Sequence, residues 1–150
     1  MPIKTKKSLS DDLTEHIVTG SVTDKEMFNT EKEFYEHEPT KRQLWDLTEA
    51  SMANITIEGM RQFIARSSRI GKSRAGGSTA VVVQGQFQFG LGRMAETFGE
   101  FESLPFVFRI FRSREKAITW LVSESDTAVE SGSVSAASTV SGSSIEISIE

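Results

Sequence analysis

Two glycine patterns within residues 80–98, AVVVQGQFQFGLGRMAETF, have spacings found in phosphate-binding loops. Gly90–Ala95 fits G-x-G-x-x-A, but a dinucleotide site needs its glycines directly after a strand, and residues 84–89 intervene here. Gly85–Gly90 has the first spacing of a P-loop, but Leu91 and Gly92 stand where Lys and Ser or Thr must hold phosphate and magnesium. We therefore predict no nucleotide site, and we expect these glycines to allow a tight turn and close helix-to-sheet contact.

Side chains suited to catalysis are sparse. The chain has no cysteine, which excludes disulfides, thiolate metal sites and cysteine nucleophiles, and its serines form no G-x-S-x-G elbow. His16 lies in a β-branched run with no evident carboxylate or nucleophile beside it. Asp46 follows the apolar part of 41–50, where open α/β sheets place ligand clefts, so it is a candidate for a sheet-edge cleft, although an Asp there more often caps a turn. We predict no catalytic residue, no metal and no cofactor, and hence no enzyme.

Charge is strongly segregated along the chain. Residues 11–58 carry 12 acidic and 4 basic residues, and Glu31 and its acidic neighbours on a helix over 24–37 are expected to face water. Residues 59–95 contain no acidic residue. The basic side chains within residues 59–95 suggest a surface that binds an anion or a partner, and the alternative is a face that is simply solvated. The candidates are Arg66, Arg69, Lys72, Arg74 and Arg93. No nucleic-acid partner is expected, because the net charge is -4 and no aromatic residues interleave with the bases.

Hydrophobic periodicity predicts alternating strands and helices, which implies an α/β sheet with right-handed crossovers. The predicted strands are 15–22, 41–50, 78–83 and 105–111, and the predicted helices are 24–37, 57–70, 91–102 and 113–122. The helix over 91–102 is expected to turn Leu91, Met94, Ala95, Phe98 and Phe101 inward. We predict a flexible segment over 1–12, one domain over 13–124, and a disordered Ser-rich tail over 125–150.

Apolar residues between the third strand and third helix could line a ligand groove. The candidates are Phe87, Phe89, Leu91 and Met94, and the alternative is that they belong to an ordinary core. Exposure of Phe87 and Phe89 would favour the hypothesis that these residues contact a ligand or a membrane. No apolar run approaches the ~18 residues of a membrane span, and the basic start Met1–Lys7 lacks the apolar stretch of a signal peptide. We expect a cytoplasmic protein.

The stretches LWDLTEASMANITIEGMRQFI, STAVVV, FGLGRMAETFGEF and FRIFRSREKAITWL make the chain resemble the SpoIIAA-like branch of bacterial STAS domains. This family is structurally similar to the CRAL-TRIO lipid-binding fold. The resemblance spans about residues 13–122. It implies a mainly parallel sheet of four or five strands packed with about four helices. It also implies a small binding or regulatory module, often dimeric, without established enzymatic activity.

The resemblance does not extend to the phosphorylation switch of the anti-sigma-factor antagonists. Their Asp-Ser-Ser/Thr-Gly motif corresponds here to Thr56-Ile57-Glu58-Gly59, and Ile57 occupies the phosphoacceptor position. An isoleucine has no hydroxyl to phosphorylate, so this regulation cannot operate at that residue. Two functions remain: a non-enzymatic module that binds a protein partner or itself as a homodimer, or a small lipid- or acyl-binding protein that associates with anionic membrane surfaces.

Overall fold

The structure is a computed structural model that describes residues 2–130. Its element order alternates strands and helices after an initial strand pair. The elements are β1 (Ile3–Ser8), β2 (Leu13–Ser21), α1 (Asp24–Glu36), β3 (Arg42–Ser51), α2 (Ile57–Ile70), the 3-10 helix η1 (Gly71–Arg74), β4 (Ser78–Val82), α3 (Gln86–Glu102), β5 (Val107–Phe111) and α4 (Arg114–Glu130). The predicted α/β class with a mainly parallel sheet is confirmed.

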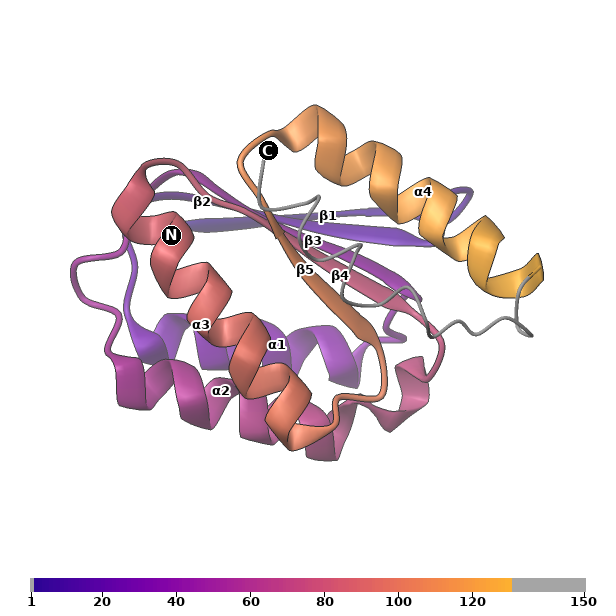
Figure 1. Cartoon of the computed structure of the whole chain (residues 1–150), viewed down its shortest axis with the longest axis horizontal. Helices are drawn as coiled ribbons and strands as arrows, with labels where there is room; N and C mark the ends of the chain where they lie inside the picture. Colours follow the sequence, from indigo (N-terminus) through magenta and orange to yellow (C-terminus); the bar gives the residue numbers. More distant parts are fainter. Residues whose placement is uncertain (1, 131–150) are drawn as a thin grey trace.

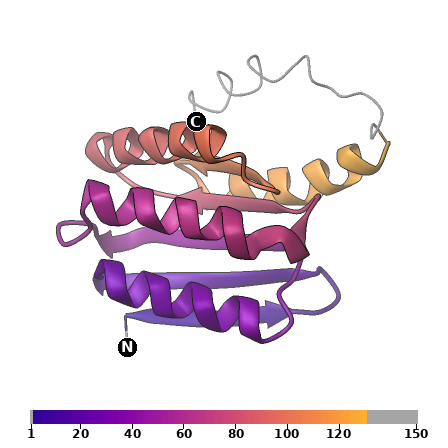
Figure 2. The same cartoon turned by 90° about the horizontal axis from the view of Figure 1, so that it is seen from below.

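The strands form one sheet whose spatial order, β1-β2-β3-β4-β5, is also their order along the chain. β1 runs antiparallel to β2, and the other pairs are parallel. Because each parallel strand is added on the same side by a right-handed crossover, the connecting helices fall on one face. Figure 1 shows α1, α2 and α3 on that face and α4 on the other. Figure 2 shows the three helices lying side by side across the sheet in chain order.

Alternate residues of each strand supply a separate apolar cluster on each face of the sheet. Under α4, the buried cluster comprises Leu13, Leu44, Ala80, Val82, Phe111, Ala117 and Leu121. Under α1–α3, it comprises Val18, Val22, Trp45, Leu47, Val83, Phe89 and Ile110. The sheet is thus the middle of three layers, and any side chain on it faces one of two distinct environments.

The predicted starts of α1 and α2 are confirmed by their caps. Thr23 forms a capping box with Glu26, in which each side chain accepts a backbone N–H from the other residue. Thr56 caps α2 by accepting from the amide of Gly59 at 2.8 Å. The Thr56 hydroxyl also donates to Asp24 at the start of α1, so the N-termini of these two helices are held together.

The prediction of a flexible segment over 1–12 is wrong for Ile3–Ser8, which is strand β1. This Lys-rich strand pairs only with β2 and forms one edge of the sheet, where charged side chains remain in water. The predicted boundary at 124 is also wrong, because α4 continues to Glu130. The rest of the predicted Ser-rich tail, 131–150, lies outside the described residues.

Helix α3 begins at Gln86, five residues before the predicted start, and its inner face differs from the predicted one. Gly85, with φ +93°, makes the turn from β4 and accepts the first helical hydrogen bond from Phe89. The buried positions of α3 are Phe89, Gly92, Ala95 and Gly99, not Met94, Phe98 and Phe101. A Cβ at Gly92 would lie 2.7 Å from Cγ2 of Ile110. Glycine therefore allows α3 to lie close to β5, as predicted for these glycines.

Candidate functional site

A cavity of about 100 Å³ lies between the sheet and the helices α1, α2 and α3. Its wall is mainly aliphatic, aromatic and methionine side chains, such as Met27, Met60, Phe63, Leu91 and Phe108. Flexible methionines fit a wall that adapts to its contents. A cavity with such a wall can take up a small apolar group.

One end of this cavity is polar. Glu31 of α1, Gln43 of β3, Ser67 of α2 and Thr79 of β4 all line it, and all four are buried. The Glu31 carboxylate accepts from Gln43 Nε2 at 2.9 Å and from Ser67 Oγ at 3.2 Å. Burial raises the pKa of Glu31 above its usual range, although these hydrogen bonds and the charge of Arg74 partly oppose the rise.

Arg74 lies behind this polar end and donates a hydrogen bond to Gln43. Its guanidinium donates to the carbonyl oxygens of Thr40, Lys41 and Ser78 at 2.8–2.9 Å, and more weakly to the Tyr35 hydroxyl and Gln43 Oε1. It also lies over the rings of Phe34 and Phe106, at 5.3 and 4.5 Å from their centroids. Arg74 is 0% exposed, so its prediction as a surface anion-binding residue is wrong. The short helix η1 turns it inward, where acceptors of five residues hold it in place.

Gln43 connects the cavity end to a buried histidine. Its Nε2 donates to Glu31 and to His16 Nε2 at 3.0 Å, while its Oε1 accepts from Arg74 and Thr79. His16 Nε2 is therefore an acceptor, which leaves Nδ1 to donate to the Thr5 hydroxyl at 2.9 Å. Burial, reinforced by the charge of Arg74, lowers the pKa of His16 to about 3. The histidine is thus neutral and structural, as expected from its sequence context.

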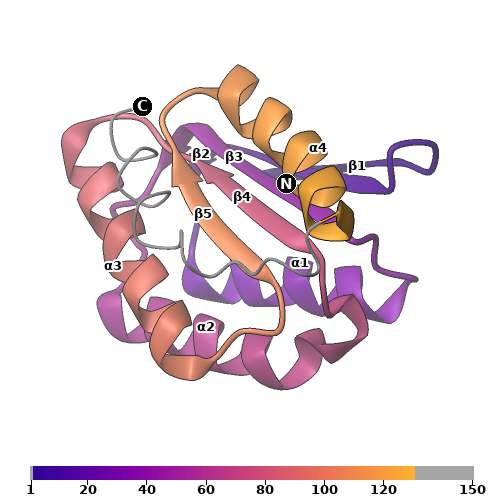
Figure 3. The ribbon, with the colours of Figure 1, turned by 45° about the vertical axis from the view of Figure 1, so that its right-hand side comes forward.

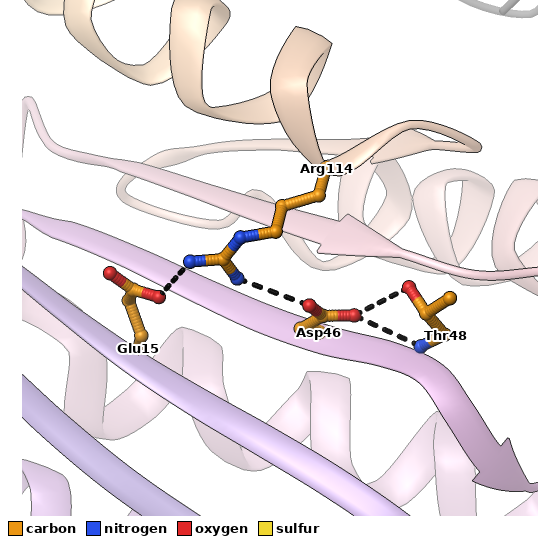
Figure 4. Close-up of polar contacts among 4 residues, drawn as sticks. All are labelled: Glu15, Asp46, Thr48 and Arg114. Atoms are coloured by element: carbon orange, nitrogen blue, oxygen red, sulfur yellow. Dashed lines mark hydrogen bonds and ion pairs between the residues drawn. The ribbon is translucent and has the colours of Figure 1, made fainter.

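Asp46 lies on the opposite face of the sheet, in an ion-pair cluster near the start of α4 (Figure 4). The Arg114 guanidinium bridges Asp46, at 3.1 Å, and Glu15 on the neighbouring strand. Asp46 also accepts from the amide and hydroxyl of Thr48. Partial burial raises the pKa of Asp46, but the bonds from Thr48 and Arg114 outweigh that effect and leave it below the usual range. Its carboxylate is therefore engaged in pinning α4 to β2 and β3.

The other basic candidates do not form one continuous surface with Arg74. The Arg66 guanidinium lies 5.3 Å from the centroid of Phe28 on α1. Arg69 and Lys72 are exposed at the end of α2 and in η1. Arg93 is on α3, where it pairs with Glu96 at 2.9 Å. The accessible bases near the end of α2 are therefore Arg66, Arg69 and Lys72.

The apolar groove candidates are divided between three environments. Phe89 is buried in the core, with the Arg112 guanidinium 4.1 Å above its ring, and Leu91 lines the cavity. Phe87 and Met94 point to solvent, where they are 72% and 37% exposed. Phe101, which was expected in the core, is 88% exposed on the same helix. Phe87 is therefore exposed and Phe89 buried, so the exposure of this pair favours neither a ligand groove nor an ordinary core.

No family model matches the chain, and no curated protein matches it. A solved structure does match, over 79% of this chain and 91% of its own, with a TM-score of 0.51 and 21% sequence identity. It is an uncharacterized protein of the DUF3478 family from Shewanella loihica PV-4 with a SpoIIAA-like fold. This chain has a SpoIIAA-like fold. The likeness confirms the architecture that the sequence stretches implied.

Two features are absent from the described residues. None of the helices in residues 2–130 has the length and apolar character that a membrane crossing requires. Across the same residues, no three side chains of the His, Asp or Glu type converge as a metal site would require. The features of the described chain that stand out are the apolar cavity with its polar end and the exposed apolar face of α3.

Proposed function

We propose that this SpoIIAA-like domain is a non-enzymatic protein-interaction module, and that it contacts its partner through the outer face of α3. The observation that supports this is a line of apolar side chains at alternating spacings of four and three residues. The line, called the α3 stripe below, consists of Phe87, Leu91, Met94, Phe98 and Phe101. Phe87, Met94 and Phe101 are exposed, whereas Phe98 and Leu91 are half-buried and Leu91 also lines the cavity. At these spacings the side chains share one side of a helix.

The α3 stripe has the chemistry of a contact surface. Phe87 and Phe101 are 72% and 88% exposed, and each phenylalanine that becomes buried removes on the order of 150 Å² or more from water. The helix is also rigidly placed, because Gly92 and Gly99 hold its inner face close to β5 and the loop after it. Apolar anchors on a rigid element lose little conformational entropy on binding.

Photo-crosslinking in cells tests this function. A benzoylphenylalanine at Thr97, which is exposed on α3 beside the stripe, is expected to form a covalent adduct that mass spectrometry identifies. The matched control is the same group at Thr119, an exposed threonine on α4 across the sheet, and no adduct is expected there. Adducts at neither position, or equal adducts at both, would contradict a contact surface on α3.

A second candidate function is the binding of a small lipid or acyl group, and the cavity favours it. The wall is apolar and contains Met27, Met52 and Met60, while Glu31 and Ser67 at the polar end offer hydrogen bonds. Such a combination orients an apolar molecule that has one polar group. Association with anionic headgroups would use Arg66, Arg69 and Lys72, because Arg74 is buried.

Native mass spectrometry of gently purified protein tests the second function. A lipid or acyl species released on denaturation is expected. It should be lost in Ala95→Leu, since Ala95 lines the cavity, and retained in Phe87→Ser, which changes an exposed position. A species that persists in Ala95→Leu would place the ligand elsewhere, and a protein without any bound species would count against this function.

A further inference from the structure

We infer that the partner of the α3 stripe is the same stripe on a second copy of this chain, packed as an antiparallel helix pair. This inference rests on the proposed function, because it names the partner of that surface. The two copies would be related by a two-fold axis through Met94, so that one patch serves as both halves of the interface. The evidence is the order of side-chain sizes along α3.

The exposed ends of the α3 stripe are self-complementary about Met94, whereas the half-buried Leu91 comes level with Thr97 of the second copy. Phe87 and Phe101 each lie seven residues from it, so in an antiparallel pair the two rings of one copy meet the two rings of the other. Gly90 and Phe98 each lie four residues from it, and this pairs the smallest residue with a large one. Gly90 is exposed, and a Cβ placed on it would have no atom within 4 Å. Open space therefore exists where Phe98 of the second copy would pack.

A parallel pair would lose both features. It would bring each phenylalanine level with its own counterpart, and Gly90 level with Gly90, so that no phenylalanine would fill the open space at Gly90. Charge also favours the antiparallel pair, because the stripe itself carries none and one flank carries Arg93 and Glu100. In the antiparallel arrangement Arg93 and Glu100 come from opposite copies about 7.5 Å apart along the axis, so Glu100 could join the Arg93–Glu96 pair within each chain. In a parallel pair the two-fold axis runs along the helices and places these flanks on opposite sides of the seam, so Arg93 and Glu100 would not meet.

The position of α3 in the fold leaves room for a second copy. Figure 3 shows α3 as the outermost helix of its layer, beside the edge strand β5, with α2 on its other side. The 17 residues of α3 span about 25 Å. One helix pair buries less than the ~800 Å² per partner of a standard interface. The dimer is therefore expected to be weak and to form in a concentration-dependent way, with a dissociation constant in the micromolar range.

Sedimentation velocity on the purified chain tests the surface. The wild-type chain is expected to shift from monomer to dimer as its concentration rises through the micromolar range. Met94→Glu places two carboxylates together on the two-fold axis and should raise the dissociation constant at least ~10-fold. Thr119→Glu adds the same charge to an exposed position on α4 and should leave it unchanged. A dimer that Met94→Glu does not weaken forms elsewhere, which would overturn the inference.

Cysteine crosslinking tests the geometry, and a chain without cysteine makes each introduced thiol unique. In a glutathione redox buffer, Met94→Cys should form a disulfide-linked dimer with itself. Phe87→Cys should link to Phe101→Cys when the two variants are mixed, but not to itself, because the two Phe87 positions lie about 21 Å apart in the antiparallel pair. Self-linking of Phe87→Cys would indicate a parallel pair and overturn the inference.

The two proposals fail in different ways. If the chain stays monomeric and Met94→Cys does not link, while the probe at Thr97 captures another protein in cells, the second copy is the wrong partner and the α3 contact surface stands. If the chain stays monomeric and Thr97 captures nothing, both are wrong. If the chain dimerises, the thiols link as expected and Thr97 captures the same chain, both hold.

Discussion

The two sides of the sheet hold an arginine in different ways. On the α4 side, Arg114 stays at the margin, with its side chain 41% exposed, and two carboxylates neutralise it above an apolar cluster. On the α1–α3 side, Arg74 is 0% exposed, and its hydrogen-bond acceptors are carbonyl, amide and hydroxyl oxygens. The first arrangement fastens a helix, whereas the second fixes the base of a cavity.

This difference indicates that the more specialised polar arrangement lies on the α1–α3 side of the sheet. Buried polar networks must be fully satisfied to be tolerated, and they restrict the core to one arrangement. A network of Glu31, Gln43, His16 and Arg74 beside an apolar cavity is therefore a more specific construction than the ion-pair cluster around Arg114. Substitutions in the buried network and in the ion-pair cluster should therefore lower the free energy of unfolding by different amounts.

The largest effect is expected from Arg74→Met. Its loss removes one hydrogen bond each from the carbonyl oxygens of Thr40, Lys41 and Ser78 in a fully buried place, and it removes the positive charge near Glu31. We expect the free energy of unfolding to fall by about 3–5 kcal/mol. Urea denaturation measures it. Arg114→Met is the control and should cost less, about 1–2 kcal/mol, because Glu15 and Asp46 keep 17% and 13% exposure and Asp46 still accepts from Thr48. Equal losses would mean that the two sides do not differ.

An intermediate effect is expected from pH. The pKa of His16 is about 3 in the folded chain, against 6.5 for an ordinary histidine. The stability that comes from keeping it neutral is fully present above pH 6.5 and is lost as pH falls from 6.5 toward 3. Between pH 7 and 4.5 the loss should be about 2–3 kcal/mol.

The control for this pH dependence is His16→Gln, which keeps a donor and an acceptor but does not titrate. The raised pKa of Glu31 acts in the opposite direction, since burying its charged form costs stability as pH rises. That contribution is common to both proteins. The difference between their urea midpoints at the two pH values therefore reports His16, and parallel curves for the two proteins would contradict the assignment.

The smallest effect is expected from Asp46→Asn on the α4 side. The substitution removes one carboxylate from Arg114, which keeps Glu15, and an amide oxygen can still accept from Thr48. We expect a loss of about 1 kcal/mol or less, which high salt should reduce further. Thermal unfolding at two salt concentrations measures it. A loss as large as that of Arg74→Met would show that this cluster is as central as the buried network.

The sequence could predict those parts of the fold that local chemistry decides. Thr23 and Thr56 mark the starts of α1 and α2, and the run STAVVV marks the central strand β4. β1 was missed because its lysines suit an edge strand and give no apolar alternation. The prediction assigns the wrong side of α3 to the core, because apolar residues cover two sides of this helix. Which side is buried depends on Gly92 meeting Ile110, a contact between distant parts of the chain.

The candidate site was less predictable, because it depends on side chains that meet only in the folded chain. Glu31 sits among acidic residues on α1 and was expected in water, yet it faces Gln43 and Ser67. Arg74 follows a glycine-rich basic stretch, and nothing local signals that η1 turns it into the core. Phe101 was identified as apolar but assigned to the wrong side of α3.

The identity between spatial and chain order in the sheet has a consequence for biosynthesis. Each strand from β2 to β5 pairs with the strand made just before it, so a partly synthesised chain leaving the ribosome never waits for a distant segment to close its sheet. The growing sheet has one incomplete edge at each step, and the next helix and strand to emerge cover it. On β5, the last strand of residues 2–130, the Glu96 carboxylate accepts the amide of Ile110 at 2.8 Å. A side chain from α3 thus occupies an amide of the final strand, and addition of a further strand, including one from another nascent chain, is blocked at that point.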